Sequence, residues 1–298
     1  MNTIRTTHSG EATNLAAFPL ALTTLSGTGA AEIGDLNLSQ PLEPLAVTAI
    51  RDAIMDFPFL VFRNQSMTKD QQARFSEYFG ELESHIGKLS DGTTFPIVHT
   101  LTNLDAAGNL INMDVAKLNY FWHTDKSYYA IPAFVTILHA LEVPPEGGDT
   151  QYANAQLAYE ALSPEIKARL TGLMAVHDWQ ASRRNSGTSP ATNEQIRERP
   201  PVSHPLVRTH PDTGKKALYL GVHVSHIAGM PQAEGKALLT QLTDHIGQDQ
   251  FVYTHRWKQG DVVMWDNRCL LHRALPNYEI ARHKRVLNRT VIVGAAPY

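Results

Sequence analysis

His123 and Asp125 stand two positions apart in a segment rich in apolar and aromatic residues, and a third candidate ligand, His272, follows much later in the chain. In a β-strand, residues i and i+2 point to the same face, so His123 and Asp125 would project side by side. If His272 joins them from a neighbouring strand, two imidazoles and one carboxylate share one face of a metal ion. This ligand set is typical of non-haem Fe(II) oxygenases. Taken alone, the pair is equally consistent with a buried His–Asp hydrogen bond without a metal.

A second histidine–aspartate pair, His210 and Asp212, provides a comparison. Proline stands between its members, and the segment continues into Thr-Gly-Lys-Lys, which is typical of a turn. Because proline has no N–H for an interior β-ladder, we predict a surface hairpin turn here. A lone histidine is usually structural, so His272 is a candidate only together with the first pair. Cys269 precedes it by three positions, but cysteine favours zinc or copper, and we expect it to pack in the core.

Two arginines near the end of the chain fall on one side of a predicted strand. With a period of two, Arg285, Leu287, Arg289 and Val291 share one face. If that face points into a barrel, the two cations require anions, because burying an unpaired charge is very unfavourable. Arginine suits bidentate binding of carboxylates, so the face predicts a site for a dicarboxylate cosubstrate and an anionic substrate. The alternative is an edge strand whose arginines lie in solvent.

A glycine-rich segment, Gly147-Gly148-Asp149-Thr150, follows a long apolar run and two prolines. By itself this segment indicates only a turn. We expect Thr150 to open the next strand, where its hydroxyl could donate a hydrogen bond to a carboxylate.

Composition limits the class of protein. The chain has 298 residues, of which 43% are hydrophobic and 18% charged, and this supports a sizeable core. The net charge is −3 without a block of like charge, so we expect neither a nucleic-acid nor a membrane partner. No apolar run reaches membrane-spanning length, and the first residues lack a signal-peptide core. The single cysteine excludes an internal disulfide framework and favours a cytoplasmic location.

The apolar pattern predicts one catalytic domain over residues 17–298, preceded by a disordered tail over residues 1–16. We expect a β-rich α+β fold, a double-stranded β-helix (jelly roll) with flanking helices. Residues 156–205 are predicted to form a helical and loop-like insertion or lid. Helices are expected over residues 45–55, 68–79, from 164 and over 231–245, and strands over residues 59–62, 96–99, 134–141, 261–265 and 286–294 and around Trp122.

These motifs together resemble the taurine dioxygenase family of Fe(II)/2-oxoglutarate oxygenases. The resemblance rests on Trp122-His123-Thr124-Asp125, Gly147-Gly148-Asp149-Thr150, Trp265-Asp266-Asn267-Arg268 with His272, and Arg285 with Arg289. It extends from the strand at residues 59–62 to the end of the chain. The stretch from Gly221-Val222-His223 through Arg256-Trp257 to His272 is most similar to the branch of 2,4-dichlorophenoxyacetate and phenoxypropionate dioxygenases.

The resemblance implies roles for individual residues at the metal. His123, Asp125 and His272 would hold Fe(II), with 2-oxoglutarate and O2 as cosubstrates. Thr150 and Arg285 would bind the far carboxylate of 2-oxoglutarate.

For the substrate, the resemblance implies a second set of residues. Arg289 would lie near the inner carboxylate of 2-oxoglutarate or the anionic group of the substrate, and Asn119 would line the site. His85 matches a histidine that contacts substrate in the taurine enzymes. Lys88 stands where those enzymes have tyrosine, which argues against taurine, although it could also be a solvated loop charge. Tyr120 belongs to a group of aromatic residues that either line an aryl pocket or fill the core.

We therefore predict a dioxygenase that couples decarboxylation of 2-oxoglutarate, to succinate and CO2, to hydroxylation of a small anionic substrate such as an aryloxyalkanoate. Sulfonates, alkyl sulfates and natural-product carboxylates are alternative substrates. Two other classes fit part of the pattern: a zinc hydrolase or lyase with the same ligands, and a non-catalytic 2-oxoglutarate sensor. The arginines and Thr150 disfavour the hydrolase, since it needs no dicarboxylate site. A homo-oligomer is expected from the resemblance only.

Overall fold

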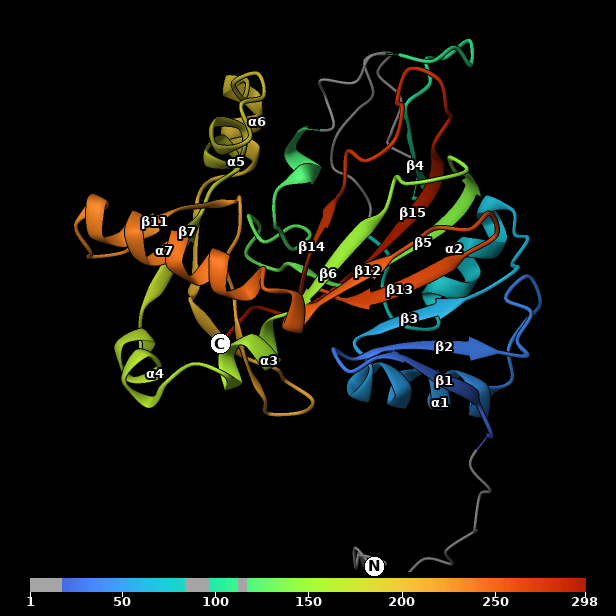
Figure 1. Cartoon of the computed structure of the whole chain (residues 1–298), viewed down its shortest axis with the longest axis horizontal. Coiled ribbons are helices and arrows are strands. Elements are labelled where there is room, and N and C mark those ends of the chain that lie inside the picture. Colours follow the sequence, from blue (N-terminus) through green and yellow to red (C-terminus); the bar gives the residue numbers. More distant parts are fainter. Residues whose placement is uncertain (1–17, 84–96, 112–116) are drawn as a thin grey trace, which may run out of the picture.

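The computed structural model describes residues 18–83, 97–111 and 117–298. Its centre is a seven-stranded sheet (Figure 1), antiparallel except for the parallel pair β2–β3. The strands of this sheet, in spatial order, are β1 (Ala21–Ser26), β2 (Ala30–Gly34), β3 (Phe59–Phe62), β13 (Val262–Asp266), β5 (Ala133–Glu142), β15 (Val286–Val293) and β4 (His99–Thr102). The expected tail over residues 1–16 lies outside the described residues.

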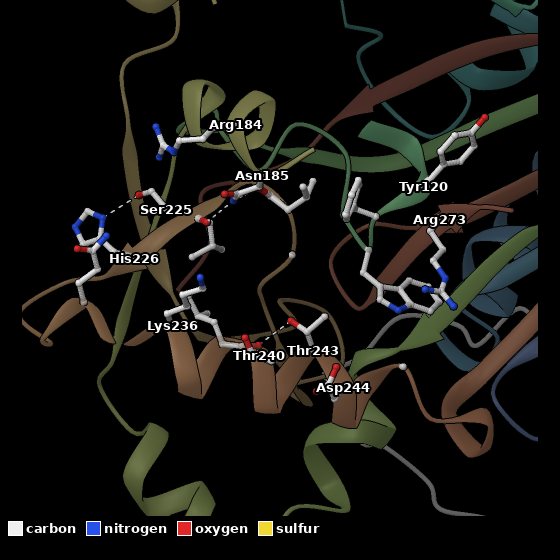
Figure 2. Close-up of a pocket in the computed structure, with 18 residues that line it drawn as sticks. Tyr120, Arg184, Asn185, Ser225, His226, Lys236, Thr240, Thr243, Asp244 and Arg273 are labelled. Carbon is white, nitrogen blue, oxygen red and sulfur yellow. Dashed lines mark hydrogen bonds between the residues drawn. The ribbon is translucent and has the colours of Figure 1, made fainter. Parts of the chain in front are cut away.

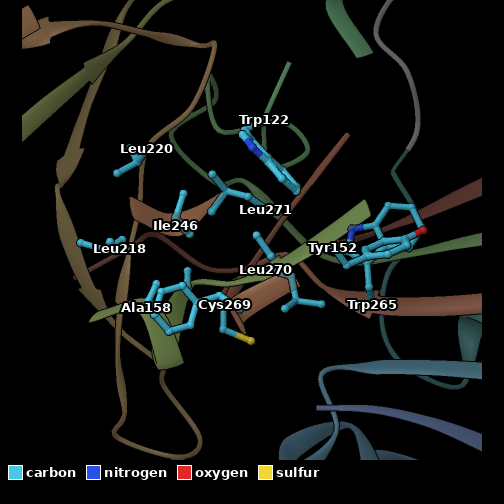
Figure 3. Close-up of a cluster of buried hydrophobic side chains, with 14 of the residues drawn as sticks. Trp122, Tyr152, Ala158, Leu218, Leu220, Ile246, Trp265, Cys269, Leu270 and Leu271 are labelled. Carbon is cyan, nitrogen blue, oxygen red and sulfur yellow. The ribbon is translucent and has the colours of Figure 1, made fainter. Parts of the chain in front are cut away.

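A second, three-stranded antiparallel sheet faces the large one. It consists of β12 (Val252–His255), β6 (Thr150–Asn154) and β14 (Leu270–Ala274). Aromatic side chains fill the space between the sheets: the Tyr152 ring lies 4.5 Å from that of Phe59 and 5.3 Å from that of Trp265, measured between centroids. Figure 3 shows Tyr152 and Trp265 side by side, with Leu270 and Leu271 continuing the same core. The two layers form the predicted jelly roll without closing into a barrel.

Helices cover the outer face of the large sheet. α1 (Pro44–Asp56) and α2 (Lys69–Glu77) bury their apolar sides against it, in a second core separate from the one between the sheets. On α1, Ile50 and Ile54 are one turn apart and therefore point to the same side. α2 starts at a capping box in which Thr68 and Gln71 bond to each other's backbone N–H, as the sequence predicts.

The remaining elements form a second layer of helices and short sheets beside β6 and β14 (Figure 1). A three-stranded sheet contains β11 (Val224–Ile227), β7 (Met174–His177) and β8 (Val202–Pro205), and a hairpin joins β9 (Val207–Thr209) to β10 (Lys216–Leu218). The helices here are α3 (Ala155–Glu160), α4 (Pro164–Leu170), α5 (Trp179–Asn185), α6 (Asn193–Glu198) and α7 (Gln232–Ile246), with 3-10 turns η1 (Lys117–Tyr120) and η2 (Asp249–Phe251). Among the described residues, no helix is long and apolar enough to cross a membrane.

One sequence expectation needs correction. The segment around Trp122 is not a strand: only His123 makes an isolated β-bridge, to His272, and a turn follows at once. His272 lies within β14, and its bridge to His123 brings the two residues together from separate segments. The interval 156–205 contains α4, α5, α6, the strands β7 and β8, and most of α3. Its role as a lid stays a prediction.

The second His-Asp segment is a turn between β9 and β10, as predicted, but His210 is not on the surface. Its side chain is 2% exposed, and its Nε2 atom lies 3.0 Å from Oδ2 of Asp266. The backbone N–H groups of Asp212 and Thr213 donate to its Nδ1 atom. The turn is therefore anchored from inside, because a buried imidazole needs partners for both nitrogens.

Candidate active site

The two predicted histidine ligands meet across the bridge between residue 123 and β14. The backbone N–H of His123 donates to the carbonyl of His272 (3.1 Å), and the reverse bond is 2.7 Å long. Paired residues in such a bridge carry their side chains on the same face, and the two imidazole centroids are 4.1 Å apart. A potential ligand atom of each histidine and of Asp125 lies within 4.8 Å of the others, and all three residues are buried.

Hydrogen bonds set which ring nitrogen of His123 is available. Its Nδ1 atom lies 2.8 Å from the carbonyl oxygen of Phe121, so Nδ1 carries the proton. A neutral imidazole then has its lone pair on Nε2. Burial lowers the pKa of His123, and it lowers that of His272 to about 3, so both rings are neutral near pH 7. On His272, Nε2 faces Oδ2 of Asp125 at 3.9 Å.

Asp125 is buried yet ionised. Burial alone would raise its pKa, but the neighbouring His272, Arg289 and His123 and the hydroxyl of Thr136 together lower it. The Thr136 hydroxyl donates to Oδ2 of Asp125 over 2.6 Å. A carboxylate that accepts such a bond stays charged and keeps one orientation.

This set of donors fits a divalent transition metal. Two neutral imidazoles and one carboxylate supply two nitrogen ligands, one oxygen ligand and a single negative charge. Imidazole suits iron, zinc and copper, and the combination with one carboxylate on one face is the arrangement found for non-haem Fe(II). The buried Nδ1 of His272 has no hydrogen-bond partner in the described part of the chain.

Beside these ligands, one cavity contains both arginines of the last strand. β15 is an interior strand between β5 and β4, so the alternative of an edge strand with solvent-exposed arginines is wrong. The cavity is lined by Leu101, Asn119, His123, Asp125, Leu138, Thr150, Trp265, His272, Ala274, Arg285, Leu287 and Arg289. Leu287 stands between the arginines, so the predicted face of alternating residues does point inward.

Arg285 has no carboxylate within ion-pair distance in the regions that the structure describes. Its Nε atom donates to the carbonyl of Gly148 (3.2 Å), and burial lowers the pKa of its guanidinium. The glycine is required here: with φ +66°, Gly148 lies where an added Cβ would come within 2.9 Å of Pro144 and 3.5 Å of Arg285. The glycine-rich turn therefore lets the backbone pack against the guanidinium.

Trp257 orients the hydroxyl of Thr150. The indole Nε1–H donates to Oγ1 of Thr150 over 3.0 Å, and both side chains are buried. Because that bond uses the oxygen as acceptor, the single hydroxyl hydrogen of Thr150 is free to donate into the cavity. The guanidinium of Arg285 lies 5.8 Å from the centre of the Trp257 ring, so one tryptophan contacts both residues at this end.

Arg289 lies closer to the ligands. Its Nη1 is 3.8 Å from Oδ1 of Asp125, and its side chain is 19% exposed. Its Nε is buried without a hydrogen-bond partner among the described residues. Asn119 also lines the cavity. The other two residues predicted to contact substrate, His85 and Lys88, lie outside the described residues.

His223, in the Gly221-Val222-His223 segment, has no role implied by the sequence motifs. Its ring stands edge-on to that of His123, 5.8 Å between centroids, and 4.9 Å from that of Tyr128. Burial holds its pKa well below the usual value, and its Nδ1 atom has no partner among the described residues. A buried polar atom of this kind near the ligands is a sign of a binding site.

Tyr120 borders a different depression, a groove of about 980 Å³ between α7, β11 and the segment before His123 (Figure 2). Figure 2 shows Lys236, Thr240 and Asp244 along one wall and Arg273 near Tyr120. None of the three ligand residues lines this groove. The Tyr120 phenol is still close enough to raise the pKa of the Arg285 guanidinium, against the lowering caused by burial.

A second group of potential ligands, His210, Asp266 and Cys269, lies apart from the cavity. Its carboxylate is already paired: Arg268 contacts Asp266 at 2.7 Å, and His210 contacts it at 3.0 Å. Burial raises the pKa of the Cys269 thiol well above its usual value, so this sulfur remains protonated. Cys269 packs in the core as expected.

The fold and the cavity define a class of enzyme, the jelly-roll dioxygenases that bind a metal and 2-oxoglutarate. The model of the taurine catabolism dioxygenase TauD, TfdA family matches residues 19–291, and the chain belongs to this family. It is therefore a 2-oxoglutarate-dependent dioxygenase, and Fe(II), 2-oxoglutarate and O2 are its cofactor and cosubstrates. Membership argues against the zinc hydrolase and the non-catalytic sensor.

Individual relatives span most of the chain. It is 36% identical over 274 residues to the alpha-ketoglutarate-dependent 2,4-dichlorophenoxyacetate dioxygenase of Cupriavidus pinatubonensis, covering 89% of this chain and 95% of that protein. It is 32% identical to an alkylsulfatase of Acinetobacter baylyi, covering 92% of this chain and 85% of that protein. The crystal structure of AAD-2 with Mn(II) and N-oxalylglycine superposes with a TM-score of 0.84 at 34% identity, covering 94% of this chain and 98% of that one.

Proposed function

We propose that His123, Asp125 and His272 hold Fe(II) and that the enzyme hydroxylates a small aryloxyalkanoate. The observation that carries this proposal is a single cavity that holds three potential metal ligands with Arg289 beside them, together with Arg285 and Thr150. Bound iron would supply the activation of O2 that couples decarboxylation of 2-oxoglutarate, to succinate and CO2, to hydroxylation of a C–H bond.

In this proposal Arg285 and Thr150 bind the far carboxylate of 2-oxoglutarate. A buried guanidinium without an internal carboxylate is stabilised by an anion from outside, and two parallel N–H donors match a carboxylate. The Thr150 hydroxyl adds a third donor because Trp257 occupies its acceptor side. This clamp aims the other end of the cosubstrate at the histidines and Asp125, which line the same cavity.

Arg289, Asn119 and His223 form the substrate end. Arg289 carries a positive charge close to Asp125, where it could pair with the substrate carboxylate or with the inner carboxylate of 2-oxoglutarate. His223 offers a buried nitrogen near His123 that has no hydrogen-bond partner among the described residues, which suits a hydrogen bond to a polar substrate group. His85, Lys88 and Tyr120 complete the proposed set from the resemblance.

The aryloxyalkanoate is favoured over a sulfate or sulfonate by similarity to the Cupriavidus enzyme, which is named for 2,4-dichlorophenoxyacetate. An alkyl sulfate is the second candidate, since the Acinetobacter relative is named an alkylsulfatase. Hydroxylation beside the ether oxygen of an aryloxyalkanoate gives a hemiacetal, which collapses to a phenol and an oxoacid. A cytoplasmic location is part of the proposal, and the single, buried Cys269 supports it.

An anaerobic absorption titration tests the metal and cosubstrate. Metal-free protein receives Fe(II) and then 2-oxoglutarate, and the visible charge-transfer band of the chelated cosubstrate is recorded. We expect the band with wild-type protein and not with Asp125→Ala. Iron binding without a band in wild-type protein would overturn the 2-oxoglutarate site.

A substrate panel then tests the anionic group. Phenoxyacetate, both enantiomers of phenoxypropionate, an alkyl sulfate and taurine are compared by the rate of succinate formation and by the oxidised product formed per succinate. We expect the tightest coupling with an aryloxyalkanoate, together with one phenol released per succinate. Coupled turnover of the alkyl sulfate alone would replace the aryloxyalkanoate by the second candidate.

A further inference from the structure

Asn267 lies in the turn between β13 and β14, is 2% exposed and does not line the cavity. It nevertheless contacts the segment that carries two of the proposed ligands. Its backbone carbonyl accepts from the Thr124 hydroxyl (2.8 Å), and its side-chain oxygen accepts from the backbone N–H of Asp125 (3.1 Å). The residue thus bonds to two successive positions of a segment that has no strand ladder of its own.

The orientation of the Asn267 amide follows from its donors. The indole Nε1–H of Trp265 (3.1 Å) and the backbone N–H of Asp125 can only donate, so the atom between them must be the amide oxygen. The amide nitrogen then points to Oγ1 of Thr136 and donates to it over 2.9 Å.

That donation determines where the Thr136 proton goes. A hydroxyl has one hydrogen, and its oxygen already accepts from Asn267, so the hydrogen is committed to Oδ2 of Asp125 at 2.6 Å. Asn267 therefore positions the Asp125 carboxylate indirectly, through Thr136. The same amide also accepts directly from the backbone N–H of Asp125. Asn267, Thr136 and Asp125 are all buried. Hydrogen bonds are strongest in such surroundings, and a missing partner is most costly there.

We propose that Asn267 is a positioning residue for the metal site, fixing both the backbone and the carboxylate of Asp125. The inference rests on the proposed role of Asp125 as a metal ligand. It also explains how His123 and Asp125 present both side chains to one cavity without lying in a strand: the bonds from Asn267 replace the missing ladder. The Trp265-Asp266-Asn267-Arg268 motif thereby acquires a physical role, since Trp265 orients the amide.

Metal binding without turnover tests this role. The affinity of metal-free protein for Mn(II) is measured anaerobically by calorimetry for wild type, Asn267→Ala, Thr136→Val and Thr136→Ser. Loss of a residue that orients a ligand weakens metal binding by about 10- to 100-fold. We expect a loss of that size for Asn267→Ala and Thr136→Val, and near wild-type affinity for Thr136→Ser, which keeps the hydroxyl.

A matched control separates positioning from general stability. Gln72→Met removes another fully buried amide, one that bonds to the carbonyl of Asn288 on the outer side of the large sheet. This variant should lose thermal stability without losing Mn(II) affinity. If Asn267→Ala does not fold, the Mn(II) affinity of Thr136→Val decides the question, because valine keeps the shape of threonine.

The possible outcomes distinguish this inference from the proposed metal site. Wild-type affinity in folded Thr136→Val and Asn267→Ala, with binding lost in Asp125→Ala, would overturn the positioning role alone. Equal Mn(II) affinity in wild type and Asp125→Ala would overturn the metal site itself. A selective loss in the Asn267 and Thr136 variants, restored by serine at 136, supports both.

Discussion

The two ends of the cavity differ in how their charges are balanced. At the ligand end, the charge on Asp125 is balanced within the chain: Thr136 donates to it and Arg289 lies 3.8 Å away. At the other end, Arg285 is half-buried without a carboxylate within ion-pair distance in the described regions, and its Nε donates to the carbonyl of Gly148. A cation in this state is unfavourable on its own.

At the ligand end the chain itself supplies the partners of the charged groups, whereas at the Arg285 end a bound carboxylate has to supply them. The ligand end keeps its shape before any metal arrives, because its hydrogen bonds are internal. The Arg285 end reaches its full stability only when a carboxylate enters, so free energy lost on folding is recovered on binding. Variants at the ligand end should therefore lose activity, whereas variants at the Arg285 end should lose affinity for 2-oxoglutarate.

The largest effect is expected at the ligand end. Changing His123, Asp125 or His272 to alanine removes one of the three proposed ligands, and we expect succinate formation to be abolished in a protein that still folds. Succinate production and thermal melting of each purified variant measure the two properties. Full activity in Asp125→Ala would contradict the assigned triad.

At the Arg285 end, we expect a variant to lose affinity for 2-oxoglutarate before its choice of substrate changes. Arg285→Ala removes a buried, charge-assisted pair worth on the order of 3–5 kcal/mol, which corresponds to a rise of more than a hundredfold in the 2-oxoglutarate requirement. The order of preference among substrates should stay unchanged. Arg282→Ala is the control, because that side chain is 73% exposed. An unchanged 2-oxoglutarate requirement in Arg285→Ala would show that the two ends do not differ as described.

A buried histidine outside the cavity gives a reference for acid stability. Burial and the nearby His204 and Arg208 lower the pKa of His177 to about 3, whereas in the unfolded chain it is near 6.5. Above pH 6.5 both states are neutral; as the pH falls from 6.5 towards 3, only the unfolded chain takes the proton. His177 should thus cost up to about 1.4 kcal/mol of unfolding free energy per pH unit in this window.

Denaturant unfolding of metal-free wild type and His177→Gln at several pH values measures that slope. The variant should lose stability less steeply below pH 6.5, whatever its stability at neutral pH. Parallel curves for the two proteins would mean that His177 is protonated in the folded state.

The smallest effect is expected for Trp257→Phe. This change keeps an aromatic ring beside Arg285 and removes only the bond to Thr150, worth about 0.5–1.5 kcal/mol. The KM for 2-oxoglutarate should rise by about 2- to 12-fold with little change in kcat. In a Thr150→Val background the same change should have no further effect, and an undiminished second effect would show that Trp257 acts by another route.

Much of the site was predictable because its residues have chemical types that few structures use together. Arg285 and Arg289 follow from strand alternation and from the cost of burying cations, Thr150 was expected to open a strand after the glycine-rich segment, and all three line one cavity. Asn119 came from the resemblance. The local geometry at His123 was not predictable, because a strand was expected where the chain makes a single bridge and a turn.

The sequence alone determined the candidate ligand types and the cationic face near β15, because these depend on residue identity and short-range periodicity, and its ordered motifs carried the resemblance to a dioxygenase family. Only the tertiary structure decided that His272 pairs with His123 and that Asn267 and Thr136 hold Asp125. It also decided that His223 stands beside the ligands. These contacts join residues far apart in the chain, and no local pattern encodes which distant amide or ring will close a given hydrogen bond.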